Sequence, residues 1–386
     1  MSLLVSVIGA GAMGSGIAQV AASNDSAVTI VDSSPQALEN SQSKLKSILN
    51  RLVEKRKINK EESQHIISNI NWSSEMNEIS NSNLVIEAIV ENMEIKQILF
   101  SQMESLVSDD CILATNTSSL SVAGIASVCN NPSRIMGIHF FNPAPLMKLV
   151  EVIPTNETDG DLLKKVKSIL EGWGKTVVTA KDTPGFIVNR VARPFYGEAL
   201  KIYEEGIADF ATVDWAMKKF GGFRMGPFEL MDYIGNDVNY SATKAVYDGT
   251  NHDPRYKPSA TQKKLMDEGL LGRKSGKGYF DYSENAVNPE PQKNEELGRK
   301  IFKRILAMLI NAAVDALNES IATRDDIDTA MKTGVNYPKG LLKWADEIGL
   351  NSQVAQLKEL HSKFEDDRYI ANPLLIKKVE ESGTFY

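Results

Sequence analysis

The first 32 residues place a glycine-rich turn between two short apolar segments. Leu3–Ile8 is mostly apolar, Gly9-Ala-Gly11-Ala-Met-Gly14 follows it, and a second apolar segment, Val28–Val31, leads into Asp32. In this spacing the first glycine allows a tight turn, the second admits a pyrophosphate to the backbone, and the third lets a helix pack closely on the strand. The pattern predicts a strand–turn–helix–strand unit that binds a dinucleotide. A glycine turn without a ligand is the alternative.

Asp32 indicates which dinucleotide binds. A carboxylate at the end of the second strand accepts hydrogen bonds from the adenosine ribose hydroxyls. Asp32 is followed by two serines and not by an arginine that would neutralise a 2′-phosphate, so NAD is favoured over NADP. The residues of this unit that we expect to contact NAD are Gly9, Gly11, Ala12, Met13, Gly14 and Asp32.

Strand-like and helix-like segments alternate to about residue 180. Short apolar runs such as Leu84–Ala88 and Ile112–Thr115 alternate with helical patterns such as Met93–Val107 and Leu162–Trp173. A longer helical region runs from 35 to 68 with a break near 57–60. This alternation predicts an α/β domain over residues 1–183 with a Rossmann-type, doubly wound sheet.

The part of the chain after Lys181–Phe186 changes character. Strand signals end there, and helical periodicity begins at Ile187. An internal repeat follows, because Ile187–Gly235 aligns without gaps on Ile301–Gly349, with matched Asp, Met and Gly positions at a shift of 114 residues. We therefore expect two tandem all-α domains, 184–282 and 296–386, joined by an Asn- and Pro-rich linker at 285–294.

A histidine and a glutamate stand on two apolar runs that flank a proline-containing turn. His139 lies in Ile135–Phe141, and Glu151 lies in Leu149–Ile153. If the two runs are strands that lie side by side, Glu151 reaches the ring of His139. A histidine held by a carboxylate is a general base with a fixed tautomer and a raised proton affinity. The pair therefore predicts proton abstraction, with a buried structural histidine as the alternative.

The composition narrows the range of partners. The chain has 43 basic and 50 acidic residues, a net charge of −7, with no long block of one sign, which argues against nucleic acid as the main partner. Cys111 and Cys129 are interpreted as buried thiols in a reducing cytosol. No segment approaches the roughly 20 apolar residues of a membrane span, and the N-terminus has no basic leader. We expect a cytoplasmic protein with no membrane partner and no metal site.

A set of motifs in sequence order resembles the 3-hydroxyacyl-CoA dehydrogenases over about residues 1–282. Besides Asp32, the motifs are Glu87-Ala-Ile-Val-Glu91-Asn, Asn116-Thr-Ser118-Ser, His139-Phe-Phe-Asn142-Pro, Lys181-Asp-Thr-Pro-Gly-Phe-Ile-Val-Asn189-Arg and Gly226-Pro-Phe-Glu-Leu. The resemblance implies NAD-dependent oxidation of a (3S)-hydroxyacyl-CoA to the 3-oxoacyl-CoA. With its repeat, the chain is similar to two-copy members of the family. The expected substrate is 3-hydroxybutyryl-CoA, and Arg224 makes 3-hydroxyadipyl-CoA the alternative.

The resemblance also implies roles for single residues. It makes His139 the base, Glu151 its orienting carboxylate, and Ser118 and Asn189 contacts to the substrate. The family positions that contact NAD outside the glycine turn fall on Glu91, Lys96, Asn116, Asn142 and Lys274. The alternatives are a helix N-cap for Ser118, an ordinary helix residue for Asn189, and a surface pair for Glu91 and Lys96.

A basic cluster lies in the long helical region, at Arg51 and 55–57. One interpretation is a clamp for the phosphates of CoA, with Lys55 as the best single candidate. A solvated helix face is the alternative.

The second copy of the repeat differs from the first at a position that the resemblance makes functional. Asn189 aligns with Lys303, and the chain given ends at Tyr386 before a second loop like Gly272–Gly278. We therefore expect one active site per chain, closed by residues 184–282. We also expect a monomeric pseudo-dimer, in which 296–386 supply the surface that single-copy members obtain from a second subunit. Further association of intact chains is the alternative.

Three rival interpretations remain at this stage. The first is a β-hydroxyacid dehydrogenase on the same scaffold, which would use a catalytic lysine. The second is a catalytically retired structural protein that binds CoA or NAD. The third is the dehydrogenase portion of a multifunctional β-oxidation protein.

Overall fold

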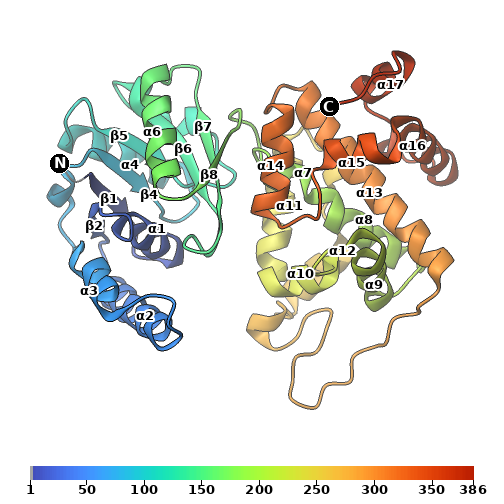
Figure 1. Ribbon diagram of the computed structural model, residues 1–386, viewed down its shortest axis with the longest axis horizontal. Helices are drawn as coiled ribbons and strands as arrows, with labels where there is room; N and C mark the ends of the chain where they lie inside the picture. Colours follow the sequence, from blue (N-terminus) through green and yellow to red (C-terminus); the bar gives the residue numbers. More distant parts are fainter. Residues whose placement is uncertain (1–2) are drawn as a thin grey trace. The chain divides into compact units, whose positions relative to one another are not determined.

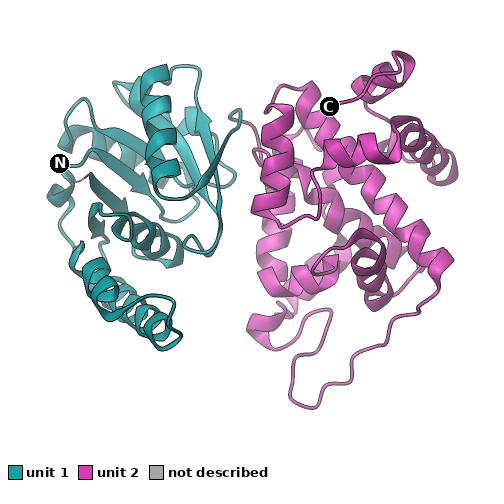
Figure 2. Ribbon diagram, viewed as in Figure 1, with its two compact units in different colours: residues 1–182 teal, residues 183–386 magenta. Residues whose placement is uncertain are grey.

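The chain divides after Asp182 into two compact units (Figure 2). The structure is a computed structural model, and it describes residues 3–386. The first unit contains a β-sheet with its helices, and the second is helical (Figure 1). Whether the helical unit consists of two separate folding domains, as the repeat predicts, stays a prediction.

The first unit is built on an eight-stranded sheet with the order β3-β2-β1-β4-β5-β6-β7-β8. Neighbouring strands are parallel except for β6 and β7, which are antiparallel. The strand order reverses between β1 and β4, and ligands of open α/β sheets bind at such a switch point. The strands are Leu4–Ile8 (β1), Ala27–Val31 (β2), Ile70–Ser73 (β3), Leu84–Glu87 (β4), Ile112–Thr115 (β5), Ile135–Phe140 (β6), Leu149–Pro154 (β7) and Thr176–Thr179 (β8).

Helices cover both faces of this sheet, as Figure 1 shows. Alternate residues of a strand point to opposite faces, so Leu84 and Ile86 join one hydrophobic core and Val85 joins the other. The first core includes α1, α2, α3 and α6, and the second includes α4 and α5. The helices are Ala12–Ala22 (α1), Pro35–Glu54 (α2), Lys60–Ser68 (α3), Met93–Leu106 (α4), Val122–Ala126 (α5) and Gly160–Gly172 (α6). The expected doubly wound α/β fold is confirmed.

The second unit repeats one helical arrangement. Helix α10, Pro227–Ile234, and helix α15, Leu341–Ile348, differ by the predicted shift of 114 residues. Helices α9 and α11 correspond in the same way to α14 and α16, and α12 corresponds to α17. The other helices are Val188–Val191 (α7), Arg193–Glu204 (α8), Phe210–Gly221 (α9), Asn236–Gly249 (α11), Ala260–Asp267 (α12), Glu295–Asn318 (α13), Arg324–Gly334 (α14), Leu350–Phe364 (α16) and Pro373–Glu380 (α17).

Matched Asp and Gly residues of the repeat have one structural cause. The Asp214 carboxylate accepts the backbone N–H groups of Phe228 and Glu229 at 2.9 and 2.8 Å, which caps the start of α10. Asp328 accepts the corresponding two N–H groups at the start of α15, at 2.9 and 3.0 Å. A Cβ on Gly226 would lie 2.3 Å from Asp214, so only glycine allows this approach. Both copies therefore share the same buried aspartate cap at the start of the equivalent helices α10 and α15, in addition to their helical sequence periodicity.

The predicted linker between the copies is attached to the first copy. Asn288 donates to the carbonyl oxygen of Asp281 at 2.8 Å, and the N–H of Gln292 donates to Thr212 Oγ1 at 2.8 Å. Asn294 then caps α13. These contacts fix the position of the linker on the first copy, although its Asn- and Pro-rich composition predicts only a connecting segment.

Within residues 3–386, no helix has both the length and the apolar character that crossing a bilayer requires.

Candidate active site

The glycine turn leaves open space at the start of α1. Gly9 has a φ of +107°, and a Cβ there would lie 2.6 Å from the carbonyl oxygen of Ala88. A Cβ on Gly14 would lie 1.9 Å from the carbonyl oxygen of Gly9, so this glycine permits the packing of α1 on the turn. No atom lies within 4 Å of the corresponding position at Gly11, which is the N-cap of α1 without a side-chain hydrogen bond. The open space and the uncapped N–H groups fit a pyrophosphate.

Asp32 is held beside this turn, directly after β2. Its Oδ2 atom accepts the N–H of Ala10 at 2.7 Å, and its Oδ1 atom accepts the N–H of Ser34 at 2.9 Å. Each carboxylate oxygen has a second lone pair, which can accept a ribose hydroxyl. Helix α1 begins at Ala12, so Ala12 and Met13 belong to its first turn.

His139 and Glu151 face each other across the antiparallel strands β6 and β7. They are register partners, and His139 Nδ1 lies 2.7 Å from Glu151 Oε2. The histidine is 6% exposed and the glutamate 0%, so the pair is shielded from water. The carboxylate fixes the orientation of the ring and, through Nδ1, its tautomer. The contact expected from two side-by-side strands is therefore present.

Glu91 holds the loop that carries Ser118. Its carboxylate accepts Thr117 Oγ1 at 2.6 Å, the Ser118 N–H at 3.0 Å and Ser119 Oγ at 3.0 Å. Burial acts to raise the pKa of Glu91, but these hydrogen bonds and the charge of Lys96 outweigh it, so the pKa lies below its usual value. The alternative of an N-cap role for Ser118 is wrong, because Ser121 caps α5.

Lys96 is a buried residue and not half of a surface pair. Its side chain is 1% exposed, and Nζ lies 2.5 Å from Glu87 Oε1 and 3.4 Å from Glu91 Oε2. Glu87 is fully buried and also accepts Thr115 Oγ1 at 2.7 Å. Glu87 is a site residue that was not predicted from the sequence. Its signal was an acidic residue at the end of an otherwise apolar strand, the same signal that identified Asp32.

Two asparagines lie near the carboxyl end of β6. Asn116 Oδ1 accepts the N–H of Phe140 at 2.8 Å, which ties the loop after β5 to β6. Asn142 is exposed and precedes a cis peptide bond to Pro143. Buried Lys175 donates to the carbonyl oxygens of Ala144 and Met147 at 2.6 and 2.9 Å, and thereby fixes the rest of this loop. Asn142 is thus exposed on a loop that the hydrogen bonds of Lys175 hold in place.

A pocket of about 510 Å³ lies beside the glycine turn, between α1, α2 and the loop 142–146. Lys44, Ile48 and Leu52 of α2 line it. These residues recur every four positions and therefore share one face of the helix. Lys55 follows three positions later as the exposed C-cap of α2, so it lies close to the same face, beyond the pocket.

Asn189 and Lys274 belong to the second unit. Asn189 is half-buried in α7, and its backbone carbonyl accepts Arg193 Nε at 2.7 Å. Lys274 lies in the loop after α12, and its Nζ is 2.6 Å from Asp237 Oδ1. The approach of these two residues to His139 stays a prediction.

Two family profiles cover nearly the whole chain. One is described as "3-hydroxyacyl-CoA dehydrogenase, NAD binding domain" and matches residues 4–183. The other, "3-hydroxyacyl-CoA dehydrogenase, C-terminal domain", matches residues 185–282 and again 301–384. The chain belongs to the 3-hydroxyacyl-CoA dehydrogenase family. It is an NAD-dependent oxidoreductase of that family, and the double match agrees with the two copies seen in the helices.

Relatives and solved structures extend this result. The chain is 33% identical to 3-hydroxyadipyl-CoA dehydrogenase from Escherichia coli over 98% of both chains. It is 41% identical to a probable 3-hydroxybutyryl-CoA dehydrogenase from Bacillus subtilis, over 72% of this chain and 97% of that one. A crystal structure of 3-hydroxybutyryl-CoA dehydrogenase from Escherichia coli superimposes with a TM-score of 0.92, 32% identity and 99% coverage of both chains.

Proposed function

We propose that this dehydrogenase oxidises short-chain (3S)-hydroxyacyl-CoA thioesters, with 3-hydroxybutyryl-CoA as the principal substrate, in fatty-acid or related acyl-CoA metabolism. The observation that carries the proposal is the shielded His139–Glu151 pair, 2.7 Å between Nδ1 and Oε2, on the sheet that also bears the glycine turn and Asp32. The names of the similar proteins from Bacillus subtilis and Escherichia coli support the substrate class.

In this mechanism His139 is the general base. The reaction removes a hydride from C3 of the substrate and a proton from its hydroxyl group, and bound NAD supplies the hydride acceptor. Because Glu151 holds Nδ1, the proton is taken at Nε2. The imidazolium that forms is stabilised by the buried carboxylate, which favours proton transfer in the forward direction. In the reverse direction the same imidazolium returns the proton to the 3-oxo group.

Ser118 and Asn189 are assigned to substrate positioning. The Glu91 carboxylate orders the 117–119 loop, so Ser118 is presented with little remaining freedom to a developing 3-oxygen charge. Asn189 completes the site from the second unit in this proposal. The same proposal makes Glu91, Lys96, Asn116, Asn142 and Lys274 the NAD contacts outside the glycine turn.

The pocket beside α2 supports a route for CoA. We assign its apolar face at Ile48 and Leu52 to the pantetheine arm and Lys55 to a phosphate group. In this assignment CoA lies along one face of α2, with its nucleotide end at Lys55 and its pantetheine arm running past Leu52 and Ile48.

A second candidate substrate is 3-hydroxyadipyl-CoA. The full-length similarity to the Escherichia coli protein of that name favours it, as does the exposed cation Arg224, which suits a terminal carboxylate.

We further propose that the protein acts as a monomer in the cytoplasm. Helix α13 packs on α8 and α9, so the second copy covers the first within one chain. Both cysteines are unpaired, as in a reducing compartment, although Cys129 is half-buried and not buried as expected.

A spectrophotometric assay at 340 nm tests the function. Acetoacetyl-CoA and 3-oxoadipyl-CoA would be reduced with NADH by the wild type, His139→Ala and the control His361→Ala, which changes an exposed histidine. Loss of the base lowers the rate by about 10²–10⁴-fold, and the control keeps its activity. Near-full activity of His139→Ala would refute the assignment, and an inactive wild type would favour a retired structural protein. The ratio of kcat/KM values for the two substrates decides between them.

A further inference from the structure

The two helical copies contact each other through equivalent residues. Arg190 and Arg304 correspond at the shift of 114, and so do Glu205 and Glu319. Arg190 Nη2 lies 2.7 Å from Glu319 Oε2, and Arg304 Nη1 lies 2.8 Å from Glu205 Oε2. Each copy thus gives an arginine to, and takes one from, the other copy. This reciprocity is the signature of an isologous, twofold interface, here formed within one chain.

A pair of aromatic rings marks the centre of this interface. Phe223 and Tyr337 also correspond at the shift of 114, and their ring centroids are 5.0 Å apart in an edge-to-face arrangement. A residue that packs on its own equivalent must lie close to the twofold axis. The ion pairs of Arg190 and Arg304 are therefore two versions of one contact.

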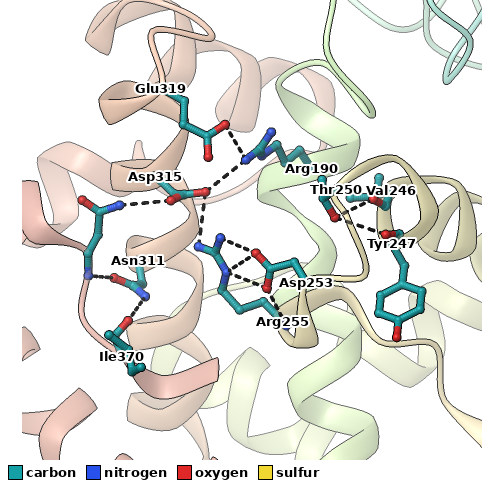
Figure 3. A network of polar contacts seen from close by, with 11 residues as sticks. Arg190, Val246, Tyr247, Thr250, Asp253, Arg255, Asn311, Asp315, Glu319 and Ile370 are labelled. Carbon is teal, nitrogen blue, oxygen red and sulfur yellow. Dashed lines mark hydrogen bonds and ion pairs between the residues drawn. The ribbon is translucent and has the colours of Figure 1, made fainter. Parts of the chain in front are cut away.

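Each arginine has a second carboxylate partner, and the second partners come from positions that do not correspond in the repeat. Asp315 is 6% exposed and accepts Arg190 Nη2 at 3.1 Å, Arg255 Nη1 at 3.2 Å and Asn372 Nδ2 at 3.0 Å. Figure 3 shows Arg190 and Arg255 converging on this carboxylate, and Arg190 Nη2 also contacts Glu319. The residue equivalent to Asp315 in the first copy is Lys201. Arg304 also has a second carboxylate partner, because Glu198 of the first copy is 2% exposed and its Oε1 lies 2.5 Å from Arg304 Nε. The two copies therefore supply the additional carboxylate from different positions of the repeat.

Arg190 directly follows Asn189 in α7, which has only four residues. So short a helix has few internal hydrogen bonds, and its orientation depends on tertiary contacts. The preceding Gly185 and Phe186 both have positive φ values, +79° and +45°, so the chain enters α7 through a sharp change of direction. Arg190 is 5% exposed, and its guanidinium is fixed by α13. Arg193, which binds the Asn189 carbonyl, holds α7 from the following helix.

We propose that Asp315 and Glu319 of the second copy are positioning residues for Asn189 and act through Arg190. In this proposal the second copy holds the Asn189 segment of the first copy in place, which we call the brace, and it also covers apolar surface of the first copy. This inference rests on the role assigned to Asn189 in the proposed function. Because a misplacement of about 1 Å can lower a rate by about 10²-fold, loss of the brace should be visible in catalysis.

The twofold relation supplies a matched control. Glu319→Gln and Glu205→Gln each remove the charge of one partner in equivalent ion pairs, but only Glu319 braces the segment of Asn189. We expect Glu319→Gln to lower kcat/KM for acetoacetyl-CoA by about ten- to a hundredfold. Glu205→Gln should stay near the wild type, with a similar change in Tm. The Kd of NADH, measured by its fluorescence, should be the same in both variants. Equal losses of activity in the two variants would overturn the brace.

A double-mutant cycle separates positioning from a general structural effect. If Glu319 acts through Asn189, Glu319→Gln should lower kcat/KM in the wild type but not in an Asn189→Ala background. A loss of equal size in both backgrounds overturns the inference and leaves the proposed function intact. Full activity of Asn189→Ala alone would refute the role of Asn189 and the brace with it.

The variants are chosen so that the protein still folds. Glu319 is 44% exposed, so its substitution is compatible with folding. At buried Asp315, Asp315→Glu keeps the charge and should retain more activity than Asp315→Asn.

Discussion

Lys96 Nζ lies 2.5 Å from Glu87 Oε1, and the two side chains are 1% and 0% exposed. Removing one partner of a buried ion pair leaves an uncompensated charge in a dry environment. We expect Lys96→Met to lower the free energy of unfolding by about 3–5 kcal/mol, measured by urea denaturation. Adding Glu87→Gln should recover part of the loss, because the orphaned charge disappears. A single Lys96→Met variant as stable as the wild type would contradict the ion-pair description.

Glu91 makes the Ser118 loop sensitive to acid. Its pKa is lowered in the folded state below the usual 4.5, so its contribution to stability is complete above that value and is lost as the pH falls through the folded pKa. We expect Glu91→Gln to flatten this acid branch of the stability curve and to lower kcat at neutral pH. Glu94→Gln, at an exposed position of α4, is the control and should leave both properties unchanged. An unaltered acid branch in Glu91→Gln would contradict the assignment.

Substitutions at Gly11 and Gly14 should affect different properties, NAD binding at Gly11 and stability at Gly14. A Cβ on Gly11 meets no atom within 4 Å, whereas one on Gly14 would lie 1.9 Å from the Gly9 carbonyl oxygen. Gly11→Ala should therefore keep the Tm of the apo-protein and weaken NAD binding, since the methyl group obstructs the pyrophosphate. Gly14→Ala should lower the Tm itself. Calorimetric titration with NADH and a thermal melt check both outcomes, and a destabilised Gly11→Ala would show that its role is structural.

Lys55 is expected to act on the substrate and not on the cofactor. An exposed ion pair contributes about 0.2–1 kcal/mol, so Lys55→Ala should raise the KM for acetoacetyl-CoA by up to about fivefold with little change in kcat. The increase should shrink at high salt, because screening already weakens the contact in the wild type. Lys57→Ala is the neighbouring control. Equal effects of the two substitutions would favour the alternative, in which the basic cluster is a solvated helix face that makes no specific contact with CoA.

The second copy should be required for a monomeric state. A chain ending at Tyr282 lacks α13, so apolar surface of α8 and α9 that packs on it becomes exposed. Large exposed apolar patches promote association. We expect this truncated chain to dimerise or aggregate in light-scattering measurements. A fully active monomer ending at Tyr282 would show that the second copy is dispensable.

Local patterns predicted much of the structure because their causes are local. Strand alternation, the glycine turn and the acid after β2 each depend on residues close in sequence, and the His139–Glu151 contact follows from one antiparallel pair of strands. The burial of Lys96 could not be predicted in this way, since Glu87 and Thr115 come from two different strands of the sheet. Nor could the contact of Arg190 with Glu319, which depends on how two helical copies pack. The repeat revealed both copies but not their twofold relation.

The reciprocal contacts of Arg190 and Arg304 have an evolutionary consequence. In a homodimer every substitution occurs twice, so a change that improves one half is also imposed on the other. A fused chain is released from that constraint, and each half can diverge alone. Asn189 against Lys303 and Asp315 against Lys201 are such divergences. Under the proposed roles, the first copy carries the substrate contact at Asn189 and the second copy holds that contact in place through Arg190, which is a division of roles that two identical subunits do not have.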